Sequence, residues 1–359
     1  MAKVAIVGAG MMGTAIAYPL ADNGHDVRLV GTHLDDEIIQ SCRQSRYHPR
    51  LKRAIPPEVR PHSVDELAEA MDGVEVIVSG VNSLGVHWIG RTLGPYLQSG
   101  QCIIAVTKGL EAAQNGDLRI LPDVLTSELP KDVRAKVKLA AIGGPCIAGE
   151  LAGRRQSCVV FGARDHDVVE AVATVFRTDY YHVWTTTDLV GLEICAALKN
   201  AYTIGVGVGL GLLEQAGGPD AAGAHMHNLA AAIFAQACTE IDHVLQLIGA
   251  TRSFACGLPG AGDLYVTCQG GRNMRLGRLL GMGHSLSEAQ QIMAGETLEG
   301  AYAVQAMAHA LPRLEARGLI TAHDFPLLRA LVSSLVHGRP VELPLGRFFA
   351  RALGHRRLD

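Results

Sequence analysis

Two lysines of this chain stand where a charged side chain is unusual. Lys108 follows the apolar run 103–106, and Lys199 lies in an apolar helical stretch in which Glu193 is the other charge. A lysine on such a helix either extends its ammonium to water along its alkyl stem or is held in place for chemistry. Burial and a second nearby cation both lower the pKa of an ammonium. Two such lysines could therefore transfer a proton near neutral pH.

A glycine-rich segment further along the chain leads into polar side chains. Residues 257–262 read Gly-Leu-Pro-Gly-Ala-Gly, and Asp263, Thr267 and the pair Arg272-Asn273 follow. We expect Asp263 to hold a lysine ammonium, Thr267 to bond a substrate hydroxyl, and Arg272 with the nearby backbone to clamp a phosphate. The alternative is a glycine corner between two helices whose polar side chains are solvated.

The N-terminus carries a glycine pattern that is typical of dinucleotide binding. The apolar run 4–7 is followed by Gly8, Gly10 and Gly13 and then by an Ala-rich helical pattern. The first glycine permits a tight turn, the second lets a pyrophosphate approach the backbone, and the third lets helix and strand pack closely. The helix N-terminus then offers N–H groups and a partial positive charge to the phosphates. The alternative is the same turn without a ligand.

The end of the second strand bears on which dinucleotide is bound. An NAD site places an acid there, about 20 residues past the glycines, to bind the ribose 2′-hydroxyl. Here the strand ends at Thr32 and His33, and Asp35 and Asp36 come slightly late. We therefore favour NADP over NAD, with Thr32 and His33 beside the 2′-phosphate. The alternative is NAD, with Asp35 turned toward the ribose.

Short β-branched runs alternate with helical patterns over the first half of the chain. The predicted strands are 4–7, 27–30, 74–81, 103–106, 137–142, 158–162 and 181–184. The predicted helices between them include 12–22, 64–71 and 166–176. This alternation is typical of a doubly wound, mostly parallel sheet of the Rossmann type, which binds ligands at the carboxyl ends of its strands.

The sequence pattern changes after a helix cap that we expect at the threonine before Asp188. Long Ala-, Leu- and Gly-rich stretches follow, and few runs resemble strands. We predict a dinucleotide-binding domain over residues 1–187 and an all-helical substrate-binding and catalytic domain over residues 188–359.

Composition restricts the class of protein and its partners. A chain of 359 residues is long enough for two domains of ~150 residues each. The net charge of −3 indicates neither a nucleic acid nor an anionic membrane as partner. Eight cysteines without a CxxC pair suit a reducing compartment, so we expect a cytoplasmic protein. The uncharged stretch 221–239 holds two histidines, so we interpret it as a buried helix and predict no membrane span.

Three polar clusters leave smaller questions open. Five basic residues form a cluster that is either a solvated loop or a means of steering an anionic substrate or cofactor. They are Arg43, Arg46, Arg50, Lys52 and Arg53. His225 and His227 could ligate a metal, but no third ligand is evident, and we predict no metal site. The basic tail from Arg351 is expected to fray.

Taken together, these segments resemble the NAD(P)-dependent glycerol-3-phosphate dehydrogenase family. The likeness extends to about residue 310 and rests on several motifs in the family's order. They are GAGMMGTAIA at 8–17, VTKGLE at 106–111, GGPCIAGELA at 143–152, ALKN at 197–200, GLPGAGDLYVTC at 257–268, GRNMRLG at 271–277 and ETLEG at 296–300. The resemblance implies reversible reduction of dihydroxyacetone phosphate to sn-glycerol 3-phosphate, in what we expect to be a homodimer.

The resemblance also implies roles for individual residues. Lys199 is expected to be the proton donor and acceptor, Lys108 the second lysine of the site, and Asp263 the supporting acid. The implied substrate contacts are Lys108, Gly144, Cys146, Asn200, Thr267, Gly271, Arg272 and Asn273. The implied cofactor contacts are Gly8, Gly10, Met11, Met12, Gly13, Thr32, His33, Lys108, Ala148, Arg272, Leu298 and Glu299. We expect the two lysines, one from each domain, to meet beside the nicotinamide ring.

The chain departs from the family pattern at two positions near the expected phosphate. Cys146 stands where the family usually has Ser or Thr, and Gly271 stands where it has Ser before the Arg-Asn pair. Losing a buried hydrogen bond typically costs ~1–3 kcal/mol. The same chemistry on another phosphorylated ketose or polyol is therefore an open alternative. A dinucleotide-sensing module without catalysis is a third reading, which the retained Lys108, Lys199 and Asp263 disfavour.

Overall fold

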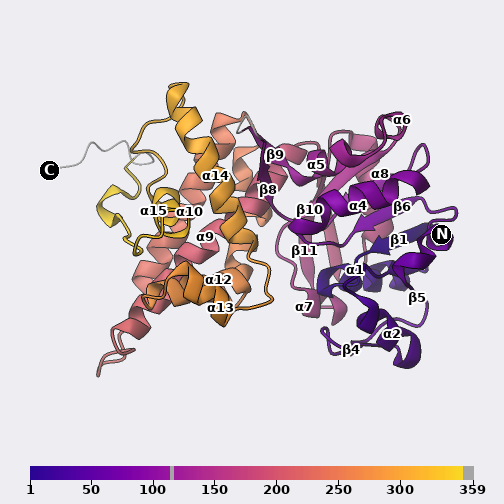
Figure 1. The fold of residues 1–359 in the computed structure, drawn as a ribbon, viewed down its shortest axis with the longest axis horizontal. Coiled ribbons are helices and arrows are strands. Elements are labelled where there is room, and N and C mark those ends of the chain that lie inside the picture. The colour runs from indigo at the N-terminus through magenta and orange to yellow at the C-terminus, as the bar shows by residue number, and fades with distance from the viewer. Residues whose placement is uncertain (114–116, 351–359) are drawn as a thin grey trace. The chain divides into compact units, whose positions relative to one another are not determined.

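The computed structural model describes residues 1–113 and 117–350, so the predicted basic tail from Arg351 lies outside the described residues. The chain forms two compact units (Figure 1). The sheet unit comprises Met1–Lys108 and Leu121–Leu192. The helical unit comprises Gly109–Ile120 and Glu193–Asp359.

An eight-stranded sheet forms the centre of the sheet unit. In chain order the strands are β1 (Lys3–Val7), β2 (Asp26–Val30), β5 (Arg60–His62), β6 (Val76–Ser79), β7 (Cys102–Ala105), β10 (Lys138–Gly143), β11 (Ser157–Ala163) and β12 (Tyr181–Thr186). Their order across the sheet is β12-β11-β10-β7-β6-β1-β2-β5. Neighbouring strands run parallel except β10 and β11, which pair antiparallel. The mostly parallel sheet predicted from the sequence is confirmed.

Helices cover both faces of this sheet. They are α1 (Met11–Asp22), α2 (Asp36–Ser45), α3 (Leu67–Ala70), α4 (Val86–Leu93), α5 (Leu121–Glu128), α6 (Lys131–Arg134), α7 (Ala148–Ala152) and α8 (His166–Phe176). Alternate residues of β1 enter different cores, because side chains of a strand point to opposite faces. Val4 and Ile6 pack with α1, α2, α7 and α8, whereas Ala5 and Val7 pack with α3, α4 and α5.

The structure contains two short hairpins that the sequence pattern did not predict. The first pairs β3 (Tyr47–His48) with β4 (Arg53–Ala54) in the sheet unit. The second pairs β8 (Leu110–Ala112) with β9 (Leu118–Ile120) and packs against α14 (Glu299–Ala316) in the helical unit. Strands of two or three residues carry too little alternation to be distinguished from loops.

Between residues 193 and 350 the helical unit is described without any strand. Besides α14 its helices are α9 (Leu189–Gln215), α10 (His227–Leu247), α11 (Asp263–Thr267), α12 (Arg272–Gly281), α13 (Leu286–Ile292) and α15 (Pro326–Leu335). The expected threonine cap of α9 is wrong. The Asp188 carboxylate caps this helix instead, because its Oδ1 accepts the Gly191 N–H at 2.8 Å. Helix α9 is long and apolar enough to cross a membrane, but 94% of its most apolar window is buried inside the protein, as in a core helix.

Candidate active site

Lys199 is a buried cation with two oxygen partners. Its side chain on α9 is 6% exposed. The ammonium Nζ donates to Asp263 Oδ1 at 2.8 Å and to Thr267 Oγ1 at 2.6 Å. A buried ammonium is tolerated only when it is paired and hydrogen-bonded. The structure therefore brings Lys199 together with two residues that are 64 and 68 positions further along the chain.

A π-helical turn orients the two partners of Lys199. Residues Leu258–Gly262 form this turn, in which the Gly262 N–H donates to the carbonyl five residues earlier at 3.0 Å. Helix α11 follows, and its i,i+4 spacing places Asp263 and Thr267 on one face. A Cβ on Gly260 would lie 2.3 Å from the Ala255 carbonyl oxygen, so the turn requires glycine there. Turns of this kind are frequent at functional sites.

The proton of the Thr267 hydroxyl has its own acceptor. Thr267 Oγ1 donates to the Asp263 backbone carbonyl at 2.6 Å. Its lone pairs are therefore available to the Lys199 ammonium. The expected bond between Thr267 and a substrate hydroxyl stays a prediction; what the structure adds is that the Thr267 hydroxyl accepts from Lys199.

Three helices meet at a buried amide. Asn273 on α12 donates through Nδ2 to Asn200 Oδ1 at 3.2 Å and accepts through Oδ1 the Gly300 N–H at 3.0 Å. A Cβ on Gly300 would lie 2.4 Å from the Asn200 carbonyl oxygen, so the approach of α14 to α9 requires glycine. Asn200 adjoins Lys199, and this junction fixes the start of α12 beside the lysine. Asn273 thus acts as a link between helices.

The start of α12 offers groups that suit an anion. Gly271 is the N-cap of this helix and supplies no side-chain acceptor for the free N–H groups of the first turn. Arg272 follows, and its half-exposed guanidinium donates to Glu299 Oε1 at 2.8 Å. Glu299 is the first residue of α14, and the buried Leu298 is its N-cap. The structure therefore brings together Arg272, Leu298 and Glu299, and their contact with the cofactor stays a prediction.

Helices α9 and α12 cross with their backbones in contact. A Cβ on Gly207 would lie 2.4 Å from the Met274 carbonyl oxygen, and one on Gly211 would lie 2.0 Å from the Arg278 carbonyl oxygen. From the other side, a Cβ on Gly277 would lie 1.9 Å from the Ile204 carbonyl oxygen. This crossing sets the separation between the helix that carries Lys199 and the helix that begins at Arg272.

In the sheet unit, the glycine turn after β1 has the shape that a dinucleotide site needs. Gly8 has a positive φ of 114°, and a Cβ there would lie 2.6 Å from the Gly80 carbonyl carbon. A Cβ on Gly13 would lie 2.1 Å from the Gly8 carbonyl oxygen. Around Gly10, by contrast, the nearest atom is 4.0 Å from such a Cβ, and Gly10 caps α1 without a side chain. The open position thus coincides with the helix N-terminus, next to the exposed Met11 and half-buried Met12.

Asp35 is engaged inside the protein. Its Oδ2 accepts hydrogen bonds from the Thr32 N–H, the Thr32 hydroxyl and the Ala9 N–H at 2.9, 2.8 and 3.2 Å. The residue is buried, with 7% exposure. This carboxylate therefore holds the glycine turn against the end of β2. His33 is exposed, and its ring meets the edge of Trp88 at a centroid distance of 5.4 Å.

Lys108 and Gly144 lie together at the carboxyl ends of β7 and β10. Lys108 Nζ donates to the Gly144 carbonyl at 3.3 Å. Thr107 donates to the Val81 carbonyl at 2.6 Å and ties the segment after β7 to the end of β6. Cys146 is half-buried and Ala148 begins α7, both in the same segment. Because Lys108 belongs to the sheet unit and Lys199 to the helical unit, their expected meeting stays a prediction.

One buried network near Lys199 escaped the sequence analysis. Tyr202, on α9, donates to Glu240 Oε2 at 2.9 Å, and Gln236 donates to Glu240 Oε1 at 2.8 Å. The same carboxylate accepts the Leu327 and Leu328 N–H groups at the start of α15. Burial raises the pKa of Glu240 against the effect of these four donors. The sequence carries little signal for this network, because Glu240 stands between Thr239 and Ile241 and is followed by Asp242, as on a solvated helix.

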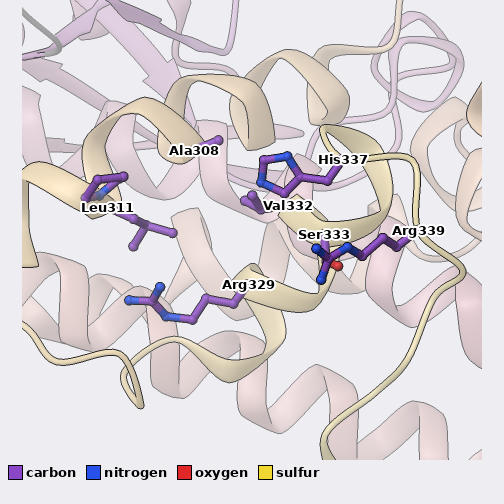
Figure 2. A pocket seen from close by; sticks show the side chains of 8 residues that line it. Ala308, Leu311, Arg329, Val332, Ser333, His337 and Arg339 are labelled. Atoms are coloured by element: carbon purple, nitrogen blue, oxygen red, sulfur yellow. The ribbon is translucent and has the colours of Figure 1, made fainter.

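A separate cavity of about 370 Å³ lies between α14 and α15 (Figure 2). Its lining comprises Ala308, Leu311, Pro312, Arg329, Val332, Ser333, His337 and Arg339. None of the residues expected to bind substrate or cofactor is among them. The cavity is therefore distinct from the Lys199 cluster.

A parallel sheet with a dinucleotide turn, together with a lysine held by a carboxylate and a hydroxyl, defines a class: NAD(P)-dependent oxidoreductases acting on a CH–OH group. The family models for the N-terminus and C-terminus of NAD-dependent glycerol-3-phosphate dehydrogenase match residues 3–169 and 188–344. The chain belongs to this family.

Individual relatives agree with this assignment. An NADP(+)-dependent glycerol-3-phosphate dehydrogenase of Archaeoglobus fulgidus is 36% identical over 288 residues, covering 80% of this chain and 82% of that protein. A glycerol-3-phosphate dehydrogenase of Bacillus cereus, named for NAD(P)+, is 32% identical and covers 99% of this chain and 97% of that protein. The crystal structure of the Coxiella burnetii glycerol-3-phosphate dehydrogenase superposes with a TM-score of 0.79 at 27% identity, over 98% of both chains.

Proposed function

We propose that this enzyme interconverts dihydroxyacetone phosphate and sn-glycerol 3-phosphate, with Lys199 as the proton donor to the carbonyl oxygen. The observation that carries the proposal is the buried ammonium of Lys199, held at 2.8 and 2.6 Å by Asp263 and Thr267. During reduction, negative charge develops on the ketone oxygen. A fixed cation in a water-poor site stabilises that charge and then delivers its proton.

The phosphate of the substrate has a binding site in this proposal. The uncapped first turn of α12 after Gly271 offers backbone N–H groups, and Arg272 adds a guanidinium. Binding the phosphate there orients the carbonyl toward Lys199, and this binding energy lowers the barrier of the chemical step. Because Gly271 has no side chain that could accept from these N–H groups, it does not compete with the phosphate for them.

The residues of the sheet unit fit a nicotinamide dinucleotide. The opening at Gly10 coincides with the N-terminus of α1, where pyrophosphate binds in this fold. When bound, the cofactor supplies the hydride. We propose that Lys108 and Gly144 border the reacting part of the site, and that NADP is preferred because Asp35 is committed to Thr32 and Ala9.

Two properties of the whole protein belong to the same proposal. The eight cysteines of the sequence include no CxxC pair, which supports a reducing cytoplasmic environment. We also propose a homodimer, which the apolar composition of the helical half of the chain supports. The molar mass in solution, measured by light scattering against the monomer value of 38.1 kDa, checks this point.

The test of the proton donor uses Lys199→Ala and Lys199→Met. Either variant should lose about 10³-fold in kcat, the middle of the range for one general acid, while NADPH binding measured by fluorescence stays within about twofold. A primary amine added to the Lys199→Ala enzyme should restore part of the turnover. The exposed Lys138, changed to Ala, is the matched control.

Near-normal turnover of both Lys199 variants would remove Lys199 from the mechanism. The substrate is tested separately, with a panel of phosphorylated ketoses and polyols. A kcat/KM for dihydroxyacetone phosphate well below ~10⁴ M⁻¹s⁻¹, together with a better substrate in the panel, would assign the chemistry to that other compound.

A further inference from the structure

The hairpin β3–β4 is fixed to the glycine turn by a buried histidine. His48 has no exposed surface, and its Nε2 lies 2.9 Å from the Ala9 carbonyl oxygen. The Leu51 N–H donates to Nδ1 of the same ring at 3.0 Å. Because Nδ1 is an acceptor, Nε2 carries the proton and donates it to Ala9. Burial lowers the pKa of His48, which favours this neutral form.

Ala9 therefore joins three parts of the dinucleotide turn. Its N–H donates to Asp35 after β2, and its carbonyl accepts from His48 in the hairpin. A second bond holds the far strand of the hairpin, since the Tyr18 hydroxyl of α1 donates to the Ala54 carbonyl at 2.7 Å. The backbone between His48 and Leu51 is thus held beside the end of β2, where the adenosine ribose lies in this fold.

Arg50 is the cation that this anchored segment carries. It lies between the two residues of the His48–Leu51 hydrogen bond, is exposed, and makes no side-chain hydrogen bond or ion pair within the described residues. Two other arginines of the basic cluster are engaged: Arg43 pairs with Glu66, and Arg46 donates to the Pro56 carbonyl. A guanidinium can bind a phosphate through two N–H groups only when those groups are not already bonded within the protein.

The end of β2 itself provides no guanidinium or ammonium. The Thr32 hydroxyl donates to Asp35, and His33 is an imidazole set against Trp88. A 2′-phosphate in this fold is usually accommodated by a nearby arginine. The hairpin, not the strand end, carries arginines: Arg50 lies between the two strands, and Arg53 lies on β4.

We propose that Arg50 binds the 2′-phosphate of NADP(H) and is the residue that makes the enzyme prefer NADP(H) over NAD(H). This inference rests on the proposed function in requiring that a nicotinamide dinucleotide binds and that NADP(H) is the preferred one. NAD(H) lacks the phosphate and has a ribose hydroxyl in its place. Arg50 therefore discriminates by contributing affinity to one nucleotide and none to the other.

The test compares Arg50→Gln with Lys52→Gln, an exposed cation of the same hairpin. The dissociation constants of NADPH and NADH are measured by nucleotide fluorescence, without substrate. Arg50→Gln should weaken NADPH binding at least tenfold and change NADH binding by less than twofold. Lys52→Gln should change NADPH binding by less than threefold.

Two outcomes would overturn the inference. One is NADPH affinity unchanged by Arg50→Gln; the other is an equal loss for NADPH and NADH, which would indicate a distorted turn. A wild-type enzyme that binds NADPH but does not reduce dihydroxyacetone phosphate would instead count against the proposed function. The two failures are therefore distinguishable.

Discussion

Lys199 is buried in the helical unit, where Asp263 and Thr267 occupy positions that water would take at the surface. Asp263 balances the charge, and Thr267 adds an acceptor whose own proton goes to the Asp263 carbonyl. This arrangement fixes the ammonium before any substrate arrives. Preorganised donors of this kind cost no reorganisation during reaction, which is why they stabilise a developing alkoxide well.

Replacing Thr267 by Val should lower kcat about tenfold, because one hydrogen bond that orients Lys199 is lost, at about 1–1.5 kcal/mol. The KM for the phosphorylated substrate should change less than kcat, since Thr267 acts through Lys199. Thr267→Ser should restore most of the activity. Steady-state kinetics of the three enzymes check this, and an unchanged kcat in Thr267→Val would contradict it.

At the scale of elements, glycines decide how closely helices approach. The contact of α9 with α12 depends on Gly207 and Gly211, each of which faces a carbonyl oxygen of α12. Gly209 lies on the same helix, but a Cβ there would be at ordinary contact distance, 3.7 Å from Ile233. The three positions are chemically alike and differ only in what they face.

Gly207→Ala and Gly211→Ala should each destabilise the protein by about 1–3 kcal/mol, because the backbones of α9 and α12 must separate. Gly209→Ala should be neutral or stabilise by up to about 1 kcal/mol, since alanine is the better helix former. Urea unfolding of the purified variants provides the comparison. Equal changes in the free energy of unfolding at all three positions would show that Gly207 and Gly211 are not required for the close crossing of α9 and α12.

The elements that carry the site are also held by buried polar links between distant segments. The Tyr202–Glu240 bond connects α9 with α10 and, through the carboxylate, with the start of α15. Each such link satisfies groups that would otherwise be buried without partners. Tyr202 and Glu240 are 38 residues apart in the sequence, so no local pattern predicts that they pair.

At the scale of the whole chain, Asp22 connects segments that are more than a hundred residues apart. Arg154 donates to both of its carboxylate oxygens at 2.7 Å, and Tyr180 donates to Oδ2 at 2.6 Å. Burial by itself would raise the pKa of Asp22, but the hydrogen bonds from Arg154 and Tyr180 and the positive charge of Arg154 outweigh it and lower the pKa. The ends of α1, α7 and the connection into β12 are joined here.

Asp22 should therefore make the stability of the protein depend on pH. A carboxyl whose pKa is lower in the folded than in the unfolded state binds fewer protons when folded. Its stabilising contribution is present above the unfolded pKa near 3.8 and is lost as pH falls through the folded value. The Tm difference between wild type and Asp22→Asn should accordingly be largest above about pH 4.5 and shrink toward pH 3.

Calorimetry from pH 3 to 7 checks this expectation, with the exposed Asp132 changed to Asn as control. The control should show little Tm difference from wild type at any pH. A Tm difference for Asp22→Asn that stays constant over the whole range would contradict the assigned pKa direction.

The amino-acid sequence by itself determined the alternation of strands and helices and the glycine turn, and it supplied the candidate reactive side chains. Short apolar runs such as β1 and the spacing of Gly8, Gly10 and Gly13 are local properties, which depend on neighbouring residues alone. Family resemblance added the order of the motifs and hence the chemistry.

The tertiary structure alone decided what those side chains touch. In the folded chain Thr267 hydrogen-bonds Lys199, Asp35 hydrogen-bonds the glycine turn at Ala9, and His48 hydrogen-bonds the Ala9 carbonyl. These partners lie between 26 and 68 residues apart, and no helical or strand period relates such positions. Hydrogen bonds of this kind form only after packing has brought the elements together, because burial is what makes an unpartnered polar group costly.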